Sequence, residues 1–373
     1  MRRVIVWFFL LTGLWFPALS QPAKTRLVYA DRNYKEVRTA REAVYTVQIV
    51  EDRDTVYFET WNKTPKALVE KGKYPTNQGY DMRNCYMQRF WPDGKIRAEG
   101  QIKKTWNEGS WRYYDEEGIL YSTVEYEEGL MTGRAVRYYP TGTRRMFTYQ
   151  KNIRNGESYL IDTASRMAEV CYYKNDTLDG VALEYFNTGQ LRRKTHYVNG
   201  LKRTDTLFWE NGVPFACEKY NTMGRLEGRC MMYTKTKRIA RYDEYSDGEL
   251  TQNDCIHPLA DETWEGDECP PRLIEASYPG GIEKYLEYVS ANQDYPEAAI
   301  QWKQQGVVEY EFTVAPDGSL KDVTEENIIP LGFGLEKESL RLLQKIKKFE
   351  PQRINGRAVP VRIRMPYVFV LQE

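Results

Sequence analysis

The sequence of 373 residues is poor in the side chains that carry most enzyme chemistry. It has two histidines, His196 and His257, and six cysteines, none of which form a Cys-x-x-Cys pair. So few histidines argue against a zinc cluster or a histidine-based catalytic centre. No Ser/His/Asp set, Cys/His set or phosphate-binding glycine loop is found either. The sequence therefore predicts a non-enzymatic protein without a cofactor or an evident small-molecule substrate.

The sequence also lacks an excess of either charge and any long apolar run beyond its start. Basic and acidic residues balance at 53 each, so no broad basic field for nucleic acid or an anionic membrane is implied. Beyond residue 20, no stretch is long and apolar enough to cross a membrane.

The N-terminus has the pattern of a signal peptide. Arg2 and Arg3 precede an apolar run that closes with Ala18-Leu19-Ser20, which predicts cleavage after Ser20 and export to the periplasm. The alternative is an inner-membrane anchor formed by residues 4–19, but the run falls short of the roughly 18 to 20 residues that a spanning helix needs.

Export allows cysteines to oxidise. Cys255 and Cys269 flank a short acidic loop, and a disulfide between them would stabilise the fold by about 3 kcal/mol in the chain-entropy model. Buried free thiols are the alternative for all six cysteines.

Two glycine series repeat with a step of 23 or 24 residues in a chain that holds 29 tyrosines. The first series is Gly94, Gly118, Gly142, Ser165, Gly189 and Gly212, and the second is Gly109, Gly133, Gly156, Gly180, Thr204 and Gly228. Segments around the first series read as strand, tight turn and strand, because glycine supplies the positive φ of short hairpin turns. We expect the second series to turn the chain into the next hairpin. Hairpins that cannot bury a face alone should stack into an elongated antiparallel meander.

The stretches GLMTGRAVRYYPTG and LDGVALEYFNTGQLRRKTHYVNG resemble the bacterial variant of the MORN repeat. The resemblance implies a scaffold that contacts protein or lipid. The expected organisation is lead-in or cap strands over residues 21–54, MORN-like repeats over 55–247 and an acidic linker over 248–277, rich in Asp, Glu and Pro. We expect the tyrosines to serve core and cross-strand packing, with a ligand groove as the alternative.

Residues 278–373 have a different pattern. Apolar residues at helical spacing, including Ile282, Tyr285 and Leu286, predict a helix, and Pro296 opens a second short helix. Alternation from Val308 predicts a strand into the Asp317-Gly318 turn, followed by a returning strand, a helix and a final strand. A small α+β domain should therefore follow the mainly β repeats.

This region resembles the TonB C-terminal domain. The matching elements are Tyr295-Pro296, Gly306, Pro316-Asp317-Gly318, the helix from Leu335, Pro351, Asn355-Gly356 and the closing strand. The resemblance implies a sheet of about three strands backed by helices, which binds an outer-membrane β-barrel transporter by adding a transporter segment to its last strand. It also implies the contact residues, which are Gln293, Tyr295, Pro296, Arg362, Arg364, Tyr367, Val368 and Phe369. For Tyr295 and Phe369 the alternative is a core role.

The closing strand carries Pro360 and Pro366 on one parity, so the two missing N–H groups fall on one side and that side should be a sheet edge. Arg362 and Arg364 keep their donors between the prolines, and Val368 keeps its donor beyond them. We expect a short strand addition at one of these segments. The protein is thus predicted to be an exported, transport-related adaptor. The alternative is an envelope scaffold whose repeats bind protein, lipid or cell wall and whose C-terminal domain forms a homodimer.

Overall fold

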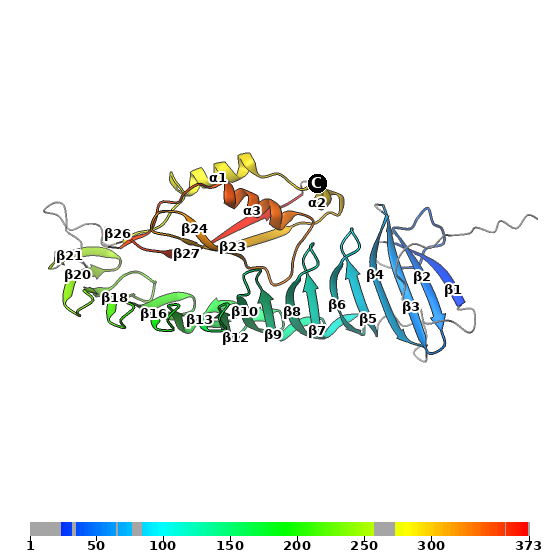
Figure 1. The fold of residues 1–373 in the computed structure, drawn as a ribbon, viewed down its shortest axis with the longest axis horizontal. Coiled ribbons are helices and arrows are strands. Elements are labelled where there is room, and N and C mark those ends of the chain that lie inside the picture. The colour runs from blue at the N-terminus through cyan, green and yellow to red at the C-terminus, as the bar shows by residue number, and fades with distance from the viewer. Residues whose placement is uncertain are drawn as a thin grey trace, which may run out of the picture. The chain divides into compact units, whose positions relative to one another are not determined.

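The computed structural model describes residues 24–31, 35–64, 66–76, 84–256, 273–354 and 356–371 (Figure 1). The expected signal peptide, much of the expected linker and Cys269 lie outside these residues. With 57% strand and 9% helix, the chain is mainly β with a small α+β C-terminal region, as predicted. Its contacts divide it into two units, residues 1–94 and 95–373.

The first unit is an antiparallel meander. Its strands are β1 (Lys24–Ala30), β2 (Tyr45–Asp52), β3 (Thr55–Lys63), β4 (Lys66–Pro75) and β5 (Cys85–Phe90). Each pairs with the next along the chain. Val56, Phe58 and Tyr74 form its buried face, because alternate side chains of a strand point to the same side.

The second unit begins with the repeat array, in which each hairpin pairs with the next. Its strands are β6 (Ile96–Lys103), β7 (Trp106–Tyr114), β8 (Leu120–Glu127), β9 (Leu130–Tyr138), β10 (Arg144–Gln150), β11 (Ile153–Arg154), β12 (Gly156–Ile161), β13 (Met167–Lys174), β14 (Thr177–Leu178), β15 (Gly180–Tyr185), β16 (Leu191–Val198), β17 (Leu201–Phe208), β18 (Pro214–Lys219), β19 (Gly228–Tyr233), β20 (Ile239–Ser246) and β21 (Glu249–Cys255). The pairing is antiparallel throughout. Strand β21 continues the array into the segment expected to be linker.

The two glycine series have different roles. Members of the first series all have positive φ, including Ser165 at 61°, and lie in hairpin turns as predicted. The prediction that the second series makes the turns between hairpins is wrong. Those turns use residue pairs such as Asn175 and Asp176, both with positive φ. The second-series glycines instead pair across from tyrosines, as Gly156 does with Tyr173.

The C-terminal domain has the predicted order of elements. These are α1 (Gly281–Asn292), α2 (Glu297–Gln301), β23 (Gly306–Val314), β24 (Leu320–Glu325), α3 (Leu335–Lys345) and β27 (Val361–Phe369). The sheet order is β24-β23-β27, and α1 and α3 lie on the face of this sheet that is turned away from the repeats (Figure 1). A second small sheet joins β22 (Leu273–Ile274), β25 (Arg353–Ile354) and β26 (Arg357–Ala358).

The core of this domain lies between the sheet and the helices. Tyr310 and Tyr367 meet edge to face with ring centroids 6.2 Å apart, and Phe312 packs on Phe349. The apolar spacing of α1 predicted the helix correctly, but of its residues only Tyr285 is buried. Ile282 and Leu286 of that helix are 65% and 58% exposed.

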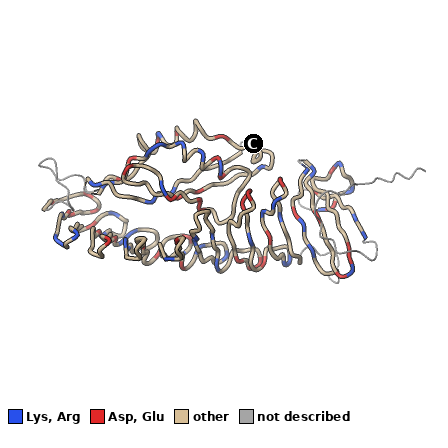
Figure 2. The backbone as a smooth tube through the Cα atoms, in the orientation of Figure 1, with Lys and Arg blue, Asp and Glu red and all other residues tan. Residues whose placement is uncertain are grey.

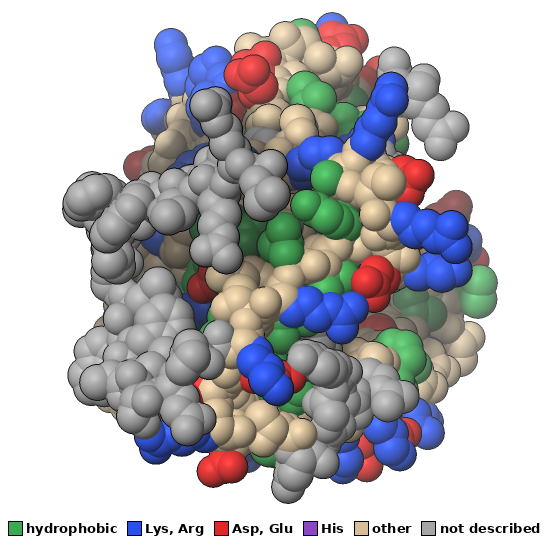
Figure 3. Space-filling model, turned by 90° about the vertical axis from the view of Figure 1, so that its right-hand side faces the viewer, with side chains coloured by type: hydrophobic (Ala, Val, Ile, Leu, Met, Phe, Trp, Pro, Cys, Tyr) green, Lys and Arg blue, Asp and Glu red, His purple; other side chains and the backbone are tan. Residues whose placement is uncertain are grey.

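Charges of both signs are interspersed along the chain (Figure 2). The face in Figure 3 likewise mixes basic, acidic and apolar side chains. Neither Figure 2 nor Figure 3 shows a field of one sign over the described residues.

The cysteines allow a direct measurement. Cys85, Cys171, Cys217 and Cys230 are free thiols, whereas Cys255 is disulfide-bonded. The proposed partner, Cys269, lies outside the described residues, so this pairing stays a prediction. We expect a thiol reagent to titrate four of the six cysteines in the unfolded, unreduced protein and all six after reduction. Six reactive thiols before reduction would contradict the pairing.

Candidate functional site

The outer edge of β27 offers hydrogen-bonding groups without a strand partner among the described residues. The backbone of Glu309 shows which β27 residues point their N–H and C=O groups toward this edge. The Glu309 N–H donates to the Asn327 side chain and its carbonyl accepts from the Glu326 N–H, both on the β24 side. Glu309 is directly opposite Pro366. In an antiparallel pair, the backbone N–H and C=O groups of two opposite residues point either toward each other or both away from each other. The backbone groups of Pro366, and of the residues at the same parity in β27, therefore point outward.

The outward parity contains Arg362, Arg364, Pro366 and Val368. The Gln293 side-chain amide donates to the Val368 carbonyl at 3.1 Å, which occupies the acceptor at that end of the edge. Arg362 and Arg364 thus present the two outward N–H groups that lie between Pro360 and Pro366, next to carbonyls that have no strand partner in the described part of the chain. The segment between the prolines is the free part of the edge.

The other predicted contact residues divide between this edge and the core. Tyr367 and Phe369 are 0% and 1% exposed, so their side chains pack inside the domain. The ring of Tyr295 meets Phe369 edge to face at 5.6 Å, and its hydroxyl donates to the Gln304 carbonyl. Pro296 precedes α2 and lies against Gly334.

The side chains of Arg362 and Arg364 face the repeats and are held by carboxylates. Arg362 lies 2.8 Å from Glu169 of β13 and 3.3 Å from Glu311 of β23. Arg364 also reaches Glu311, at 2.8 Å. The two residues at the free edge are therefore connected to the repeat array through side chains.

An ionic anchor joins the C-terminal domain to β10. Arg145 has a side chain only 2% exposed and lies 2.8 Å from Glu311, 3.3 Å from Glu326 and 3.7 Å from Glu169. Burial alone would raise the pKa of Glu311, but the guanidinium groups of Arg145, Arg362 and Arg364 outweigh it and hold the pKa below its ordinary value. Glu311 is thus ionised and bound by three arginines.

A second ionic contact lies beside the first. Arg137 of β9 pairs with Glu325 at 2.9 Å, and its guanidinium stacks on the Tyr121 ring at 3.3 Å. The Tyr121 hydroxyl donates to Glu325 and also lies 2.9 Å from the Asn327 carbonyl oxygen. Burial raises the pKa of Glu325 to about 7, although Arg137 and the Tyr121 hydroxyl act in the opposite direction.

We expect the attachment of the domain to the repeats to weaken as pH rises toward neutrality. The pKa of Glu325 is raised from 4.5 to about 7, so the folded state favours the protonated carboxyl. The stability that this protonation adds is fully present below pH 4.5 and is lost as pH rises through 7. Glu311, with its lowered pKa, acts only at more acidic pH. The measurement is the urea midpoint at pH 5 and pH 7.5 for wild type and Glu325→Gln. An unchanged pH dependence in the variant would contradict this assignment.

An apolar anchor lies at the other end of the domain. Ile354 of β25 is buried in one cluster with Phe215, Ala216 and Met232 of the repeats, and Val359 packs against the same cluster. The domain thus meets the array at β18 to β20 through apolar side chains and at β8 to β10 through charged ones.

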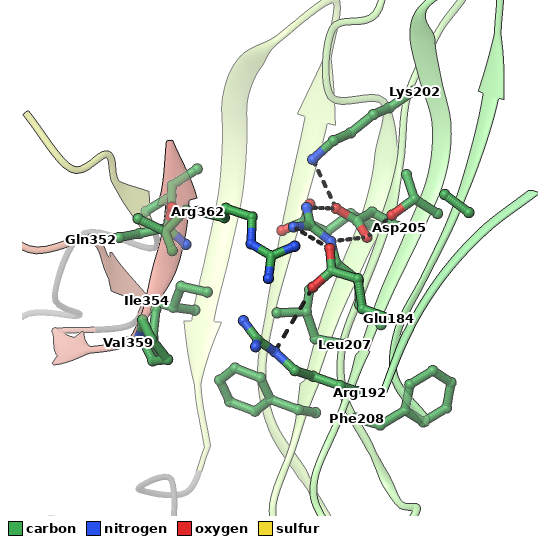
Figure 4. Close-up of a pocket in the computed structure, with 18 of the residues that line it drawn as sticks. Glu184, Arg192, Lys202, Asp205, Leu207, Phe208, Gln352, Ile354, Val359 and Arg362 are labelled. Carbon is green, nitrogen blue, oxygen red and sulfur yellow. Dashed lines mark hydrogen bonds and ion pairs between the residues drawn. The ribbon is translucent and has the colours of Figure 1, made fainter. Parts of the chain in front are cut away.

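Between the two anchors is a cavity of about 1110 Å³ (Figure 4). One wall is the segment from Pro360 to Arg364, and the opposite wall comes from β15, β16 and β17. On the repeat wall, Asp205 is buried and accepts from Arg193, Thr195 and Lys202, each at 2.9 Å. Small-molecule sites commonly have volumes of about 300 to 1,000 Å³, so this cavity is slightly larger than most of them.

Sequence reasoning missed both anchors and this cavity. A signal was present, because Arg137 and Arg145 occupy the buried parity of their strands beside Ala135 and Phe147. Charged residues at such positions require partners from elsewhere. The described residues contain no cluster suited to a metal ion and no helix long and apolar enough to cross a membrane.

Comparisons with known families agree with this architecture. Residues 291–371 match the family model of the Gram-negative bacterial TonB protein C-terminal. Residues 107–128 and 178–199 match the MORN repeat variant. A search of the curated proteins found no match. Both families are non-enzymatic kinds of domain. These matches support a TonB-like, envelope-associated protein, with repeats similar to the MORN variant followed by a C-terminal domain similar to that of TonB.

Proposed function

We propose that the protein is an exported adaptor that binds an extended segment of an outer-membrane transporter as an added strand on β27. The observation that carries this proposal is the pair of outward N–H groups at Arg362 and Arg364, on an unpaired edge of a domain that matches the TonB family. Main-chain hydrogen bonds supply affinity in this mode of recognition, and neighbouring side chains supply selectivity.

The edge supports one short site of addition rather than two. Pro360 and Pro366 remove donors on either side of the segment, and Gln293 occupies the carbonyl of Val368. An incoming strand therefore finds consecutive donors and acceptors only around Arg362 and Arg364. The repeats carry the domain and leave this edge available.

The test compares Arg364→Pro with Arg364→Ala in the chain from residue 21 onward. Both variants lose the ion pair with Glu311, but only proline removes the outward N–H, so the alanine variant is a matched control. We expect wild type and Arg364→Ala to recover a β-barrel transporter from outer-membrane extract, and Arg364→Pro to lose it. Equal recovery by all three proteins would overturn strand addition at this segment.

The second candidate is an envelope scaffold in which β27 pairs with β27 of another copy. An unpaired edge strand is compatible with self-association. A mass measurement separates the candidates, since a homodimer that Arg364→Pro converts to a monomer would favour the scaffold. A monomer at all concentrations would leave transporter binding as the use of the edge.

A further inference from the structure

We infer that the repeats are not only a support for the TonB-type domain but form the second wall of its binding site, which selects an extended peptide segment with an acidic side chain. This inference rests on the proposed strand addition and adds the specificity of the site. It follows from the cavity between β27 and strands β15 to β17.

The free edge opens into this cavity. Its lining includes every residue from Val359 to Arg364, among them the two residues that carry the outward N–H groups. A strand that pairs with Arg362 and Arg364 would therefore lie between the C-terminal domain and the repeats. The cavity volume of about 1110 Å³ is enough for a short extended peptide.

The anchors on either side keep the two walls apart. Ile354 is buried on the repeats at one end, and Arg145 binds Glu311 and Glu326 at the other. The domain is thus attached at both ends of the cavity, so the edge and the repeat wall face each other at a defined separation. Preorganised walls lower the cost of binding an extended segment.

The part of the repeat wall that comes from β15 to β17 carries one more basic than acidic side chain. Arg192, Arg193 and Lys202 stand against Glu184 and Asp205. Arg193 and Lys202 both form ion pairs with Asp205. Arg192 has a weaker ion pair with Glu184, at 3.9 Å. Over the whole lining the two signs balance, so the surplus is confined to the part near Arg192.

Arg192 and Arg362 extend into the cavity from opposite walls (Figure 4). Each side chain keeps 38% of its surface exposed. A carboxylate on the bound strand would pair first with Arg192, whose contact with Glu184 is long, because Arg362 is already paired with Glu169 and Glu311. Guanidinium groups bind carboxylates with charge-assisted hydrogen bonds. Aromatic side chains of the same wall, Phe208 and Trp209, offer contacts for an apolar neighbour in the peptide.

The test selects a displayed library of random nonapeptides on the full chain from residue 21 onward. We expect wild type to enrich β-forming peptides with aspartate or glutamate at one position. Arg192→Glu should replace that acid by lysine or arginine, and weaken the best wild-type peptide at least tenfold in fluorescence anisotropy. Arg166→Glu is the control, because Arg166 is an exposed arginine of the repeats that does not line the cavity.

The outcomes separate this inference from the proposed function. If Arg192→Glu leaves the selected sequences unchanged while Arg364→Pro abolishes selection, strand addition stands and the repeat wall is not part of the site. If neither variant changes the selection, strand addition at β27 fails as well. Failure to enrich any peptide, or a dimer occupying the edge, would overturn the inference.

Discussion

Replacing Arg145 with methionine is expected to release the C-terminal domain from β10 and to lower the free energy of unfolding by about 3 to 5 kcal/mol. The Arg145 guanidinium lies 2.8 Å from Glu311 and 3.3 Å from Glu326, with 2% of its side chain exposed. Methionine is apolar and removes the cation that both carboxylates share in a region of low dielectric. Among the described residues, the one cation that Glu326 then keeps is Arg364, at 3.9 Å, whereas Glu311 keeps Arg362 and Arg364. Urea denaturation, followed by hydrogen exchange at residues 325–328, measures the loss.

The matched control is Arg225→Met. Arg225 pairs with Asp247 at 2.7 Å, but the two side chains are 56% and 63% exposed, and a surface pair of this kind contributes about 1 kcal/mol or less. Adding Glu326→Gln to Arg145→Met should recover part of the stability, because without Arg145 the nearest cation to the Glu326 carboxylate in the described residues is Arg364, at 3.9 Å. A cost for Arg145→Met no larger than for Arg225→Met would show that the ionic anchor does not hold the domain.

Changing Gly318 to alanine should destabilise the C-terminal domain by about 2 to 5 kcal/mol, as the sum of a backbone and a packing effect. Gly318 has φ +81°, which L-residues with a side chain adopt at a cost. A Cβ there would lie 2.3 Å from the backbone carbonyl oxygen of Phe349. Backbone cannot rotate away as a side chain can, and the Phe349 N–H also donates to the Gly318 carbonyl at 2.9 Å.

Gly189→Ala separates the two effects. Gly189 has nearly the same φ, +84°, but a Cβ there meets no atom within 4 Å. Gly189→Ala should lower the free energy of unfolding only by the left-handed backbone strain of about 1 to 2 kcal/mol. Thermal unfolding of both variants, followed by near-ultraviolet circular dichroism, gives the comparison. Equal costs would mean that the contact with Phe349 does not matter.

The elements of the C-terminal domain could be predicted because each has a local cause. Alternating apolar residues set β23, the Asp317-Gly318 pair supplies the turn that follows it, and helical spacing sets α3. The repeat period likewise follows from glycines and tyrosines at fixed steps. These patterns depend on neighbours in sequence, so no knowledge of distant contacts was needed.

The turn assignment between hairpins failed for a physical reason. Asn175 and Asp176 tolerate positive φ better than most residues with a side chain, so the chain reverses there without glycine. The glycine at position 180 pairs across from Tyr197 instead. The first glycine series therefore lies in hairpin turns, whereas the glycines of the second series lie in strands opposite tyrosines.

The candidate site could be predicted only in part. The prolines on the closing strand located the edge, because missing donors are visible in sequence. The cavity and the anchors depend on how the C-terminal domain folds back on the repeats, and Glu325 meets Arg137 across 188 residues of chain. Charged residues on a buried parity indicate that a partner exists but not which segment supplies it.

The side-chain connections of β27 have a mechanical consequence. A strand added to β27 and then pulled would load the backbone of Arg362 and Arg364, whose guanidinium groups bind Glu169 and Glu311. Glu311 passes the load to Arg145 on the repeats. Part of the tension would thus cross from domain to array through guanidinium–carboxylate contacts, so that these contacts share with the apolar anchor at Ile354 the force needed to separate the two parts.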